Sequence, residues 1–211
     1  RIYILLLSAV LIIGGSGCGV KNESSETKKP EPTLNEWQKD FLTEQNLPTE
    51  YEELNLTQRL SVAAIYEMIM YLEDKYGVTF EYTGYVRPQI LENEYMTAIP
   101  KGGNELTDTV TVTRQDDGTL KDDYPNIVVR PYFEQMITDY VEDYFGSDDI
   151  RVFSTVTKTS INDLTIITEE TISGNISGRS TVFISKDLGS KEEMIKFAND
   201  YCIWLKKHDI S

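Results

Sequence analysis

An almost continuous run of apolar residues opens the chain and differs from every later segment. Residues 2–13 read IYILLLSAVLII and follow a single basic residue. A helix of this length rises only about 18 Å, whereas the hydrocarbon core of a bilayer is roughly 30 Å thick. A short apolar run with a basic start and small residues behind it is typical of a signal peptide. We therefore expect residues 1–17 to be a signal segment outside the folded domain.

Four later stretches carry apolar residues at the spacing of an amphipathic helix. Residues that commonly begin or end helices bound them. Thr33 and Ser190 each stand three residues before a glutamate, as in a capping box, Pro131 suits the first helical position, and Gly77 suits a left-handed helix end. The predicted helices cover residues 33–46, 57–76, 131–146 and 190–207.

Alternating apolar and polar residues between these helices predict strands. The predicted strands cover residues 78–86, 93–99, 108–115, 126–129, 150–157, 163–172 and 179–185. Neighbouring strands are joined by short turns, of which Asp116-Asp117-Gly118 is the clearest. Short connections favour antiparallel pairing over a doubly wound parallel sheet.

The order of elements predicts an α+β fold with a mostly antiparallel sheet packed by three to four helices. A helix plus a β-meander comes first, and a second half of helix and strands follows. We expect one domain over residues 33–211, with a sub-lobe break near 125–131.

Small residues lead into a cysteine directly behind the apolar run. Residues 14–19 read GGSGCG, which resembles a bacterial lipobox with Gly15 in the place where a Leu is usual. The resemblance implies that Cys18 is lipidated and becomes the mature N-terminus, and two acyl chains suffice for stable anchoring. The alternatives are an uncleaved anchor and an ordinary signal with an incidental Cys. Residues 18–32 are polar and rich in Ser, Glu, Lys and Pro, which predicts a disordered tether.

The charge balance places the acidic excess on the predicted domain. The chain holds 20 Lys and Arg against 35 Asp and Glu, a formal net charge of −15. Loss of the signal would remove Arg1 and make the charge −16, while the charges of the tether cancel. Nucleic acid is excluded as a partner, since phosphate binding needs a basic face.

Two segments carry a resemblance to a known group of proteins. Residues 71–82 read YLEDKYGVTFEY, and residues 122–132 read DDYPNIVVRPY. They resemble a pattern in small surface lipoproteins of Gram-positive (Firmicutes-type) bacteria, which pair a helix ending in KYG with an antiparallel meander. The resemblance spans residues 65–145. It implies the compartment and the helix-plus-meander arrangement, and it implies no catalytic residue, since the function of these proteins is unknown.

Few residues are available for nucleophilic or metal chemistry. The chain has one His and two Cys, too few for most zinc sites. We expect His208 to be a solvated helix end, and Cys202 to be a buried, inert thiol on the apolar stripe of the last helix. No cofactor is predicted. An irregular calcium site that pools neighbouring carboxylates is the metal alternative, and its ligands would be Asp116, Asp117, Asp122 and Asp123.

Tyrosine is the other residue in excess, with 13 Tyr against 2 Trp. Exposed tyrosines suit protein or sugar binding, because each offers flat apolar area with a polar tip. Most follow the predicted core stripes, but four lie near turns and are the candidate ligand-binding residues. These four are Tyr85, Tyr95, Tyr124 and Tyr132.

Together these patterns predict a lipid-anchored binding protein without catalytic activity, on the outer face of a Gram-positive cell membrane. Its expected partners are the membrane, through the lipid on Cys18, and a protein or cell-wall component. One alternative is a carboxylate- or cation-dependent cell-wall hydrolase, and the acidic turns motivate it. Another is an inhibitor or immunity-type lipoprotein, which would share every one of these sequence features.

Overall fold

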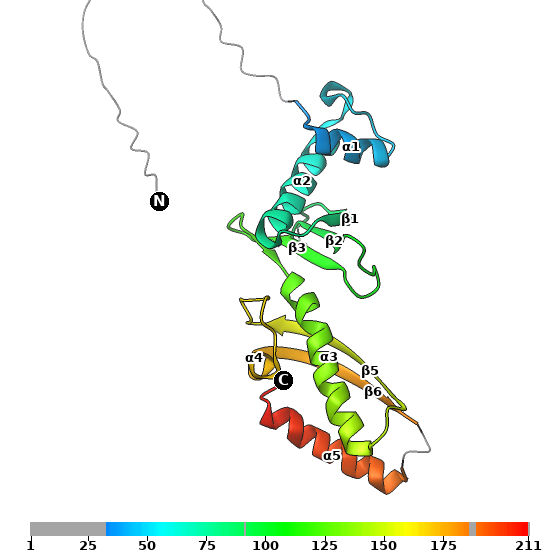
Figure 1. The fold of residues 1–211 in the computed structure, drawn as a ribbon. Helices are drawn as coiled ribbons and strands as arrows, with labels where there is room; N and C mark the ends of the chain where they lie inside the picture. Colours follow the sequence, from blue (N-terminus) through cyan, green and yellow to red (C-terminus); the bar gives the residue numbers. More distant parts are fainter. Residues whose placement is uncertain (1–32, 91, 186–188, 211) are drawn as a thin grey trace, which may run out of the picture. The chain divides into compact units, whose positions relative to one another are not determined.

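The computed structural model describes residues 33–90, 92–185 and 189–210, and these residues form a mixed α+β fold (Figure 1). Their strands make an antiparallel four-stranded sheet in the order β1-β2-β3-β4 and an antiparallel pair, β5-β6. The predicted fold class is therefore confirmed. The predicted signal, Cys18 and the tether lie outside the described residues.

The first half consists of helices followed by the four-stranded meander. Its elements are α1 (Glu36–Glu44), a short 3-10 helix at Tyr51–Glu53, α2 (Leu56–Tyr76), β1 (Phe80–Val86), β2 (Tyr95–Pro100), β3 (Val110–Arg114) and β4 (Leu120–Asp122). The predicted capping box at Thr33 is wrong, because Asn35 caps α1 through the backbone N–H of Gln38. The end of α2 at Gly77 is confirmed, with a left-handed φ of 66°.

The core of the first half lies between α2 and one face of the sheet. One side of α2 contributes Ile65, Met68 and Leu72, and the sheet contributes Met96 and Val112, all buried. Full burial of one such side chain contributes roughly 1.5–3 kcal/mol. The short strand β4 was not predicted, since three largely polar residues show no alternation.

The long helix α3 (Tyr124–Phe145) corrects two predictions. Residues 126–129 are not a strand, and Pro131 does not begin the helix but lies inside it. The β-branched pair Val128-Val129 favours a strand by intrinsic propensity, but Val129 is completely buried in a helical position, and packing outweighs intrinsic propensity. The proline in the first turn of α3 is Pro125 and not Pro131, and a missing N–H costs little at that position.

The second half packs a strand pair and a last helix around α3. Its elements are β5 (Ile150–Thr159), α4 (Glu169–Ile172), β6 (Ile176–Ile184) and α5 (Lys191–Lys207). The predicted strand at 163–172 is wrong. Asp163 binds Thr165, and Thr168 caps α4, so local side-chain hydrogen bonds replace a strand ladder there. The predicted capping box of Ser190 with Glu193 is confirmed.

The buried residues of the described chain form two hydrophobic clusters. The first belongs to the helices and sheet that precede α3, and the second to α3 and the elements after it. The change between the clusters falls on the first turns of α3, where Ile127 packs against the first cluster and Val129 belongs to the second.

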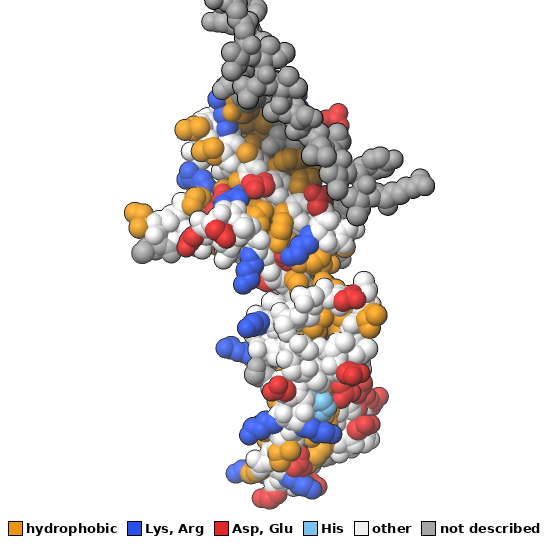
Figure 2. Space-filling view, turned by 90° about the vertical axis from the view of Figure 1, so that its left-hand side faces the viewer, with side chains coloured by type: hydrophobic (Ala, Val, Ile, Leu, Met, Phe, Trp, Pro, Cys, Tyr) orange, Lys and Arg blue, Asp and Glu red, His pale blue; other side chains and the backbone are white. Residues whose placement is uncertain are grey.

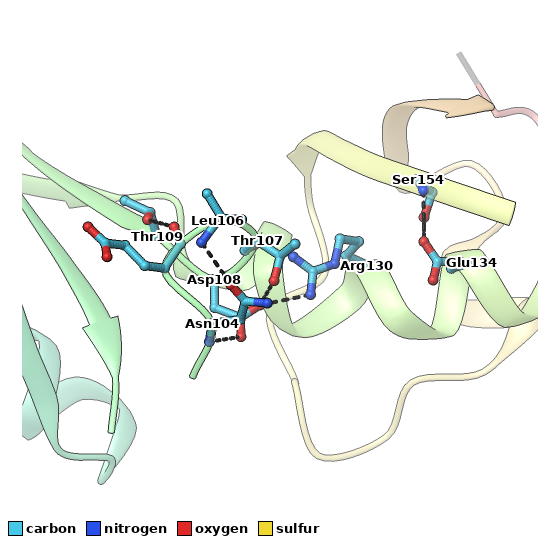
Figure 3. A network of polar contacts seen from close by, with 9 residues as sticks. Asn104, Leu106, Thr107, Asp108, Thr109, Arg130, Glu134 and Ser154 are labelled. Carbon is cyan, nitrogen blue, oxygen red and sulfur yellow. Dashed lines mark hydrogen bonds and ion pairs between the residues drawn. The ribbon is translucent and has the colours of Figure 1, made fainter. Parts of the chain in front are cut away.

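A polar network joins the β2–β3 loop to α3 (Figure 3). Asp108 accepts hydrogen bonds from Arg130, at 2.8 Å, and from the backbone N–H of Asn104, at 2.7 Å. Further along α3, Glu134 accepts the backbone N–H of Ser154 in β5. Polar side chains of α3 thus attach it to elements on both sides.

Candidate functional site

The two tyrosines predicted in the sheet lie on opposite faces of it. Tyr85 pairs across the strands with Met96, and Val86 pairs with Tyr95. Side chains of directly paired residues lie on the same face of a sheet, and successive residues alternate. Since Met96 is buried against α2, Tyr85 faces α2 and Tyr95 faces away from it.

The other two candidate tyrosines, Tyr124 and Tyr132, both belong to α3 but lie apart on it. Tyr124 packs into the first cluster, with its ring centroid 4.6 Å from that of Tyr76 and 5.1 Å from that of Phe80. Tyr132 is 48% exposed, further along the helix. The structure therefore does not bring the four candidate tyrosines together on one surface.

Asp122, one of the predicted calcium ligands, is bound into the protein instead. Its side chain is completely buried. It accepts hydrogen bonds from the hydroxyls of Tyr71, at 2.8 Å, and Tyr76, at 2.7 Å, and it lies 2.6 Å from Lys75 Nζ. Burial would raise the pKa of Asp122, but the bonds from Lys75, Tyr76 and Tyr71 outweigh it and hold the pKa below its ordinary value. This carboxylate attaches the end of α2 to β4.

The other predicted calcium ligands have separate surroundings. Asp117 accepts bonds from Thr119 within the exposed turn, while Asp123 accepts the backbone N–H of Thr111 at 2.7 Å. Burial raises the pKa of Asp123. Asp116 is exposed on the turn. Across the described ranges, no three Asp, Glu, His or Cys side chains are grouped to hold a metal ion, and the four carboxylates of the calcium alternative are not gathered around one point.

The predictions for the last helix need correction. Cys202 is exposed, because the buried stripe of α5 runs along its aromatic residues and Cys202 falls beside it. The side chain of His208 is only 12% exposed, so it is not a solvated helix end. Its Nε2 lies 2.9 Å from Glu169, and its Nδ1 lies 2.8 Å from the carbonyl oxygen of Trp204. Both ring nitrogens thus have partners within the protein.

A groove of about 980 Å³ lies between α2 and the end of β1. Its wall on α2 is one helical face made of Leu60, Ala63, Ala64 and Glu67. The rest of the lining comes from the end of β1 and the residues after it, with Tyr85, Val86, Arg87, Pro88 and Gln89, from Glu94 just before β2, and from Arg114 at the end of β3. The small side chains of the two alanines leave the space open, and the lining is mostly apolar.

Three of the four charged side chains in the groove are bound to one another. Arg114 Nη2 lies 2.7 Å from Glu67, and Arg114 Nε donates to Glu94, which also accepts the hydroxyl of Tyr85. Bonds to Glu67 and Glu94 raise the pKa of Arg114 further, and burial raises the pKa of Tyr85. Because both carboxylates bind Arg114, neither is placed as the free acid of a glycosidase pair. This network shapes the groove.

The rim of the groove carries exposed aliphatic side chains. Leu60 is 62% exposed, and Ile90, just beyond the lining, is completely exposed. Leu56 lies one turn before Leu60 on α2 and is also exposed. Figure 2 shows hydrophobic side chains at the surface of this half of the molecule. Arg87 is exposed and takes part in none of the ion pairs of the described residues. It donates one long hydrogen bond, of 3.4 Å, to the hydroxyl of Thr57.

The groove was not foreseen from the sequence. The sequence signal that could have revealed it is the face of α2 opposite the core stripe, where Leu60, Ala63 and Ala64 stand among the polar residues expected on a solvated face. The positions of Arg87 and Glu94 beside that face depend on strand pairing and have no sequence signature.

Comparison with family models, with curated proteins and with solved structures gave no match to this chain. The resemblance to Gram-positive lipoproteins stays a prediction. Within the described part of the chain, no helix is both long and apolar enough to cross a membrane.

Proposed function

We propose that this protein is a lipid-anchored, extracytoplasmic binding protein that holds a segment of a partner protein in the groove between α2 and the end of β1. The observation that carries the proposal is the open, mostly apolar groove with exposed aliphatic residues at its rim. Ligand sites of this size are concave and apolar, with a few polar groups that fix orientation.

The chemistry of the groove favours a segment with an aliphatic side chain and a carboxylate. The aliphatic group would pack between Leu60 and Ala63, where it would cover apolar surface now in contact with water. The carboxylate would pair with Arg87, which has no acidic partner of its own among the described residues. Arg114 binds both Glu67 and Glu94 and compensates one of their two negative charges, and Arg87 compensates the other, so the described lining as a whole carries no net charge.

The location of this function depends on the predicted signal, tether and lipidated Cys18. Mass spectrometry of the native protein is expected to show an acylated Cys18 at the N-terminus. Mature protein that keeps the residues before Cys18 without a lipid would contradict the anchor, and it would leave the groove proposal in place.

A displayed peptide library selected on the intact chain tests the groove. We expect enriched peptides to combine an aliphatic residue with Asp or Glu. Ala63→Trp, at an exposed position of α2, would fill the groove and lower peptide affinity at least about tenfold. Arg87→Gln would remove one charge-assisted hydrogen bond and lower affinity about tenfold.

Two variants outside the groove match these substitutions. Ala198→Trp adds the same bulk at an exposed position of α5, and Lys39→Gln removes one positive charge from an exposed position of α1. Both are expected to bind as the unchanged protein does. Enriched peptides that bind all four variants equally would refute the groove as the site.

A further inference from the structure

A second hollow, of about 350 Å³, lies in the other half of the molecule between α3, α4 and the end of α5. Aromatic rings and carboxylates make up much of its lining. The rings belong to Tyr132, Tyr140 and Trp204, and the carboxylates to Asp139, Asp143 and Glu169. It shares no lining residue with the groove beside α2.

The aromatic wall of this hollow is held in place by its neighbours. The rings of Tyr140 and Trp204 are stacked, with centroids 4.6 Å apart and planes 23° apart. Both also stack on Tyr201, which in turn stacks on the buried Phe197. Tyr132 lies on α3 two turns before Tyr140. Two of the three rings therefore have fixed orientations before any ligand arrives.

Two of the three carboxylates of the hollow, those of Asp139 and Asp143, have no cationic partner among the ion pairs of the described residues. Asp139 accepts a hydrogen bond of 2.7 Å from the neutral amide of Gln135, and Asp143 is exposed, with no partner among the ion pairs of the described residues. Glu169 contacts His208 at 2.9 Å. Among the residues that the structure describes, the lining includes no Lys or Arg. Figure 2 shows acidic side chains gathered along one edge of this half.

Aromatic faces and uncompensated carboxylates together favour an organic cation. The face of an aromatic ring attracts a cation, and the effect is strongest for Trp. A small hydrated metal ion would gain little from the rings, and a neutral sugar could donate hydroxyl hydrogen bonds to the carboxylates but would leave their negative charge unbalanced. An alkylated ammonium group uses both, because its carbon atoms pack on the rings while its charge is balanced by the carboxylates.

We propose that this hollow is a binding site for an organic ammonium group. The cationic head would lie against Trp204 and Tyr132, and Asp139 and Asp143 would supply the opposite charge. The site is independent of the groove beside α2, so the protein would bind a small cation in one half and a protein segment in the other.

Tryptophan fluorescence reports on this site directly. The chain has two tryptophans, and Trp37 lies on α1 in the first cluster. The variant Trp37→Phe leaves Trp204 as the single tryptophan. The full chain, kept in a maltoside detergent that carries no charge, would be titrated with choline, with spermidine, with 3,3-dimethyl-1-butanol as the neutral isostere of choline, and with magnesium chloride.

We expect choline or spermidine to give a saturable change in Trp204 fluorescence, at a concentration at least tenfold below that of any change with the neutral isostere. Choline and spermidine distinguish a quaternary ammonium site from one for protonated amines. Equal responses to choline and its neutral isostere would overturn the proposal, as would a response to magnesium that matches the organic cations. The absence of a saturable change with either organic cation would overturn it too.

Variants decide whether the response comes from the hollow. Asp143→Asn is expected to weaken binding of the organic cation at least fivefold, and Tyr132→Ala at least threefold. Asp149→Asn makes the same change in charge at an exposed position outside the lining, and it is expected to leave binding unchanged. Equal weakening by Asp143→Asn and Asp149→Asn would show general attraction to an acidic protein and would overturn the site. Failure here would not affect peptide binding in the groove, which Ala63→Trp tests separately.

Discussion

Asp122 and Asp123 are neighbours in the sequence, yet their surroundings shift their pKa values in opposite directions. Burial acts on both and would raise both pKa values. Asp122 also receives hydrogen bonds from Lys75, Tyr76 and Tyr71, which lower its pKa. Asp123 has no such set of charged and phenolic donors, so burial dominates. Residue type alone therefore did not reveal which member of this acidic turn is structural.

The same substitution is expected to have opposite consequences at these two positions. Asp122→Asn removes a buried charge that Lys75 and two tyrosines bind, and we expect a loss of about 2–4 kcal/mol in the free energy of unfolding. Asp123→Asn keeps an oxygen that can accept from Thr111 and removes a charge that burial disfavours, so stability is expected to stay the same or to rise. Urea unfolding at neutral pH measures both. A loss at Asp123 equal to that at Asp122 would contradict this account.

Stability is expected to depend on pH through Asp122. The folded pKa of Asp122 lies below the unfolded value of about 3.9, so its contribution is complete above that pH. As the pH falls through the lower folded pKa, Asp122 becomes protonated and the contribution is lost. Urea unfolding between pH 5 and pH 2 is expected to show a smaller decrease for Asp122→Asn than for the unchanged chain. Parallel pH profiles would contradict this.

At the scale of elements, α3 shows where packing overrides local sequence signals. Its residues include a β-branched run and an internal Pro131, and both features argue against a continuous helix. Burial of Val129, Phe133 and Ile137 along one face nevertheless gives a helix through them. The segments with clear caps and regular spacing, α2 and α5, were predicted correctly, because their local and tertiary preferences agree.

Replacement of Pro131 tests whether packing keeps α3 helical in spite of this proline. Pro131 is exposed and lacks the N–H that would bond to the carbonyl four residues earlier. Pro131→Ala is expected to raise the free energy of unfolding by about 1–3 kcal/mol. Pro125→Ala, in the first turn, is the control and is expected to bring no such gain. Thermal unfolding compares them, and a loss of stability in Pro131→Ala would mean that the packing of α3 requires proline there.

At the scale of the whole molecule, the sequence predicted the fold class, the meander and the last helix, but not the binding surfaces. Periodicity identifies elements, whereas a groove depends on which faces meet after folding. Leu60 and Arg87 line the same groove although they lie far apart in the sequence, one on α2 and the other just after β1. Tyr85 and Tyr95, in contrast, lie on opposite faces of the sheet although both are near turns. Cys202 looked buried because the width of the apolar stripe on α5 was overestimated.

The link between α3 and the β2–β3 loop is expected to contribute to the stability of the whole described fold. Arg130→Gln would break its bond to the half-buried Asp108 and would lower the free energy of unfolding by about 1–2 kcal/mol. A double-mutant cycle with Asp108→Asn measures the coupling between the two side chains. Lys121→Gln, an exposed cation without a described ion pair, is the control. Strict additivity in the cycle would show that the pair contributes nothing.

The central claim is that the groove beside α2 holds a segment of a partner protein. Hydrogen exchange of the intact chain, with and without a peptide enriched on it, tests this claim most directly. Added protection is expected in residues 60–67 and 85–90, with the amides of β5 and β6 unchanged. Protection that appears in β5 and β6 while residues 60–67 exchange as in the free protein would contradict the claim.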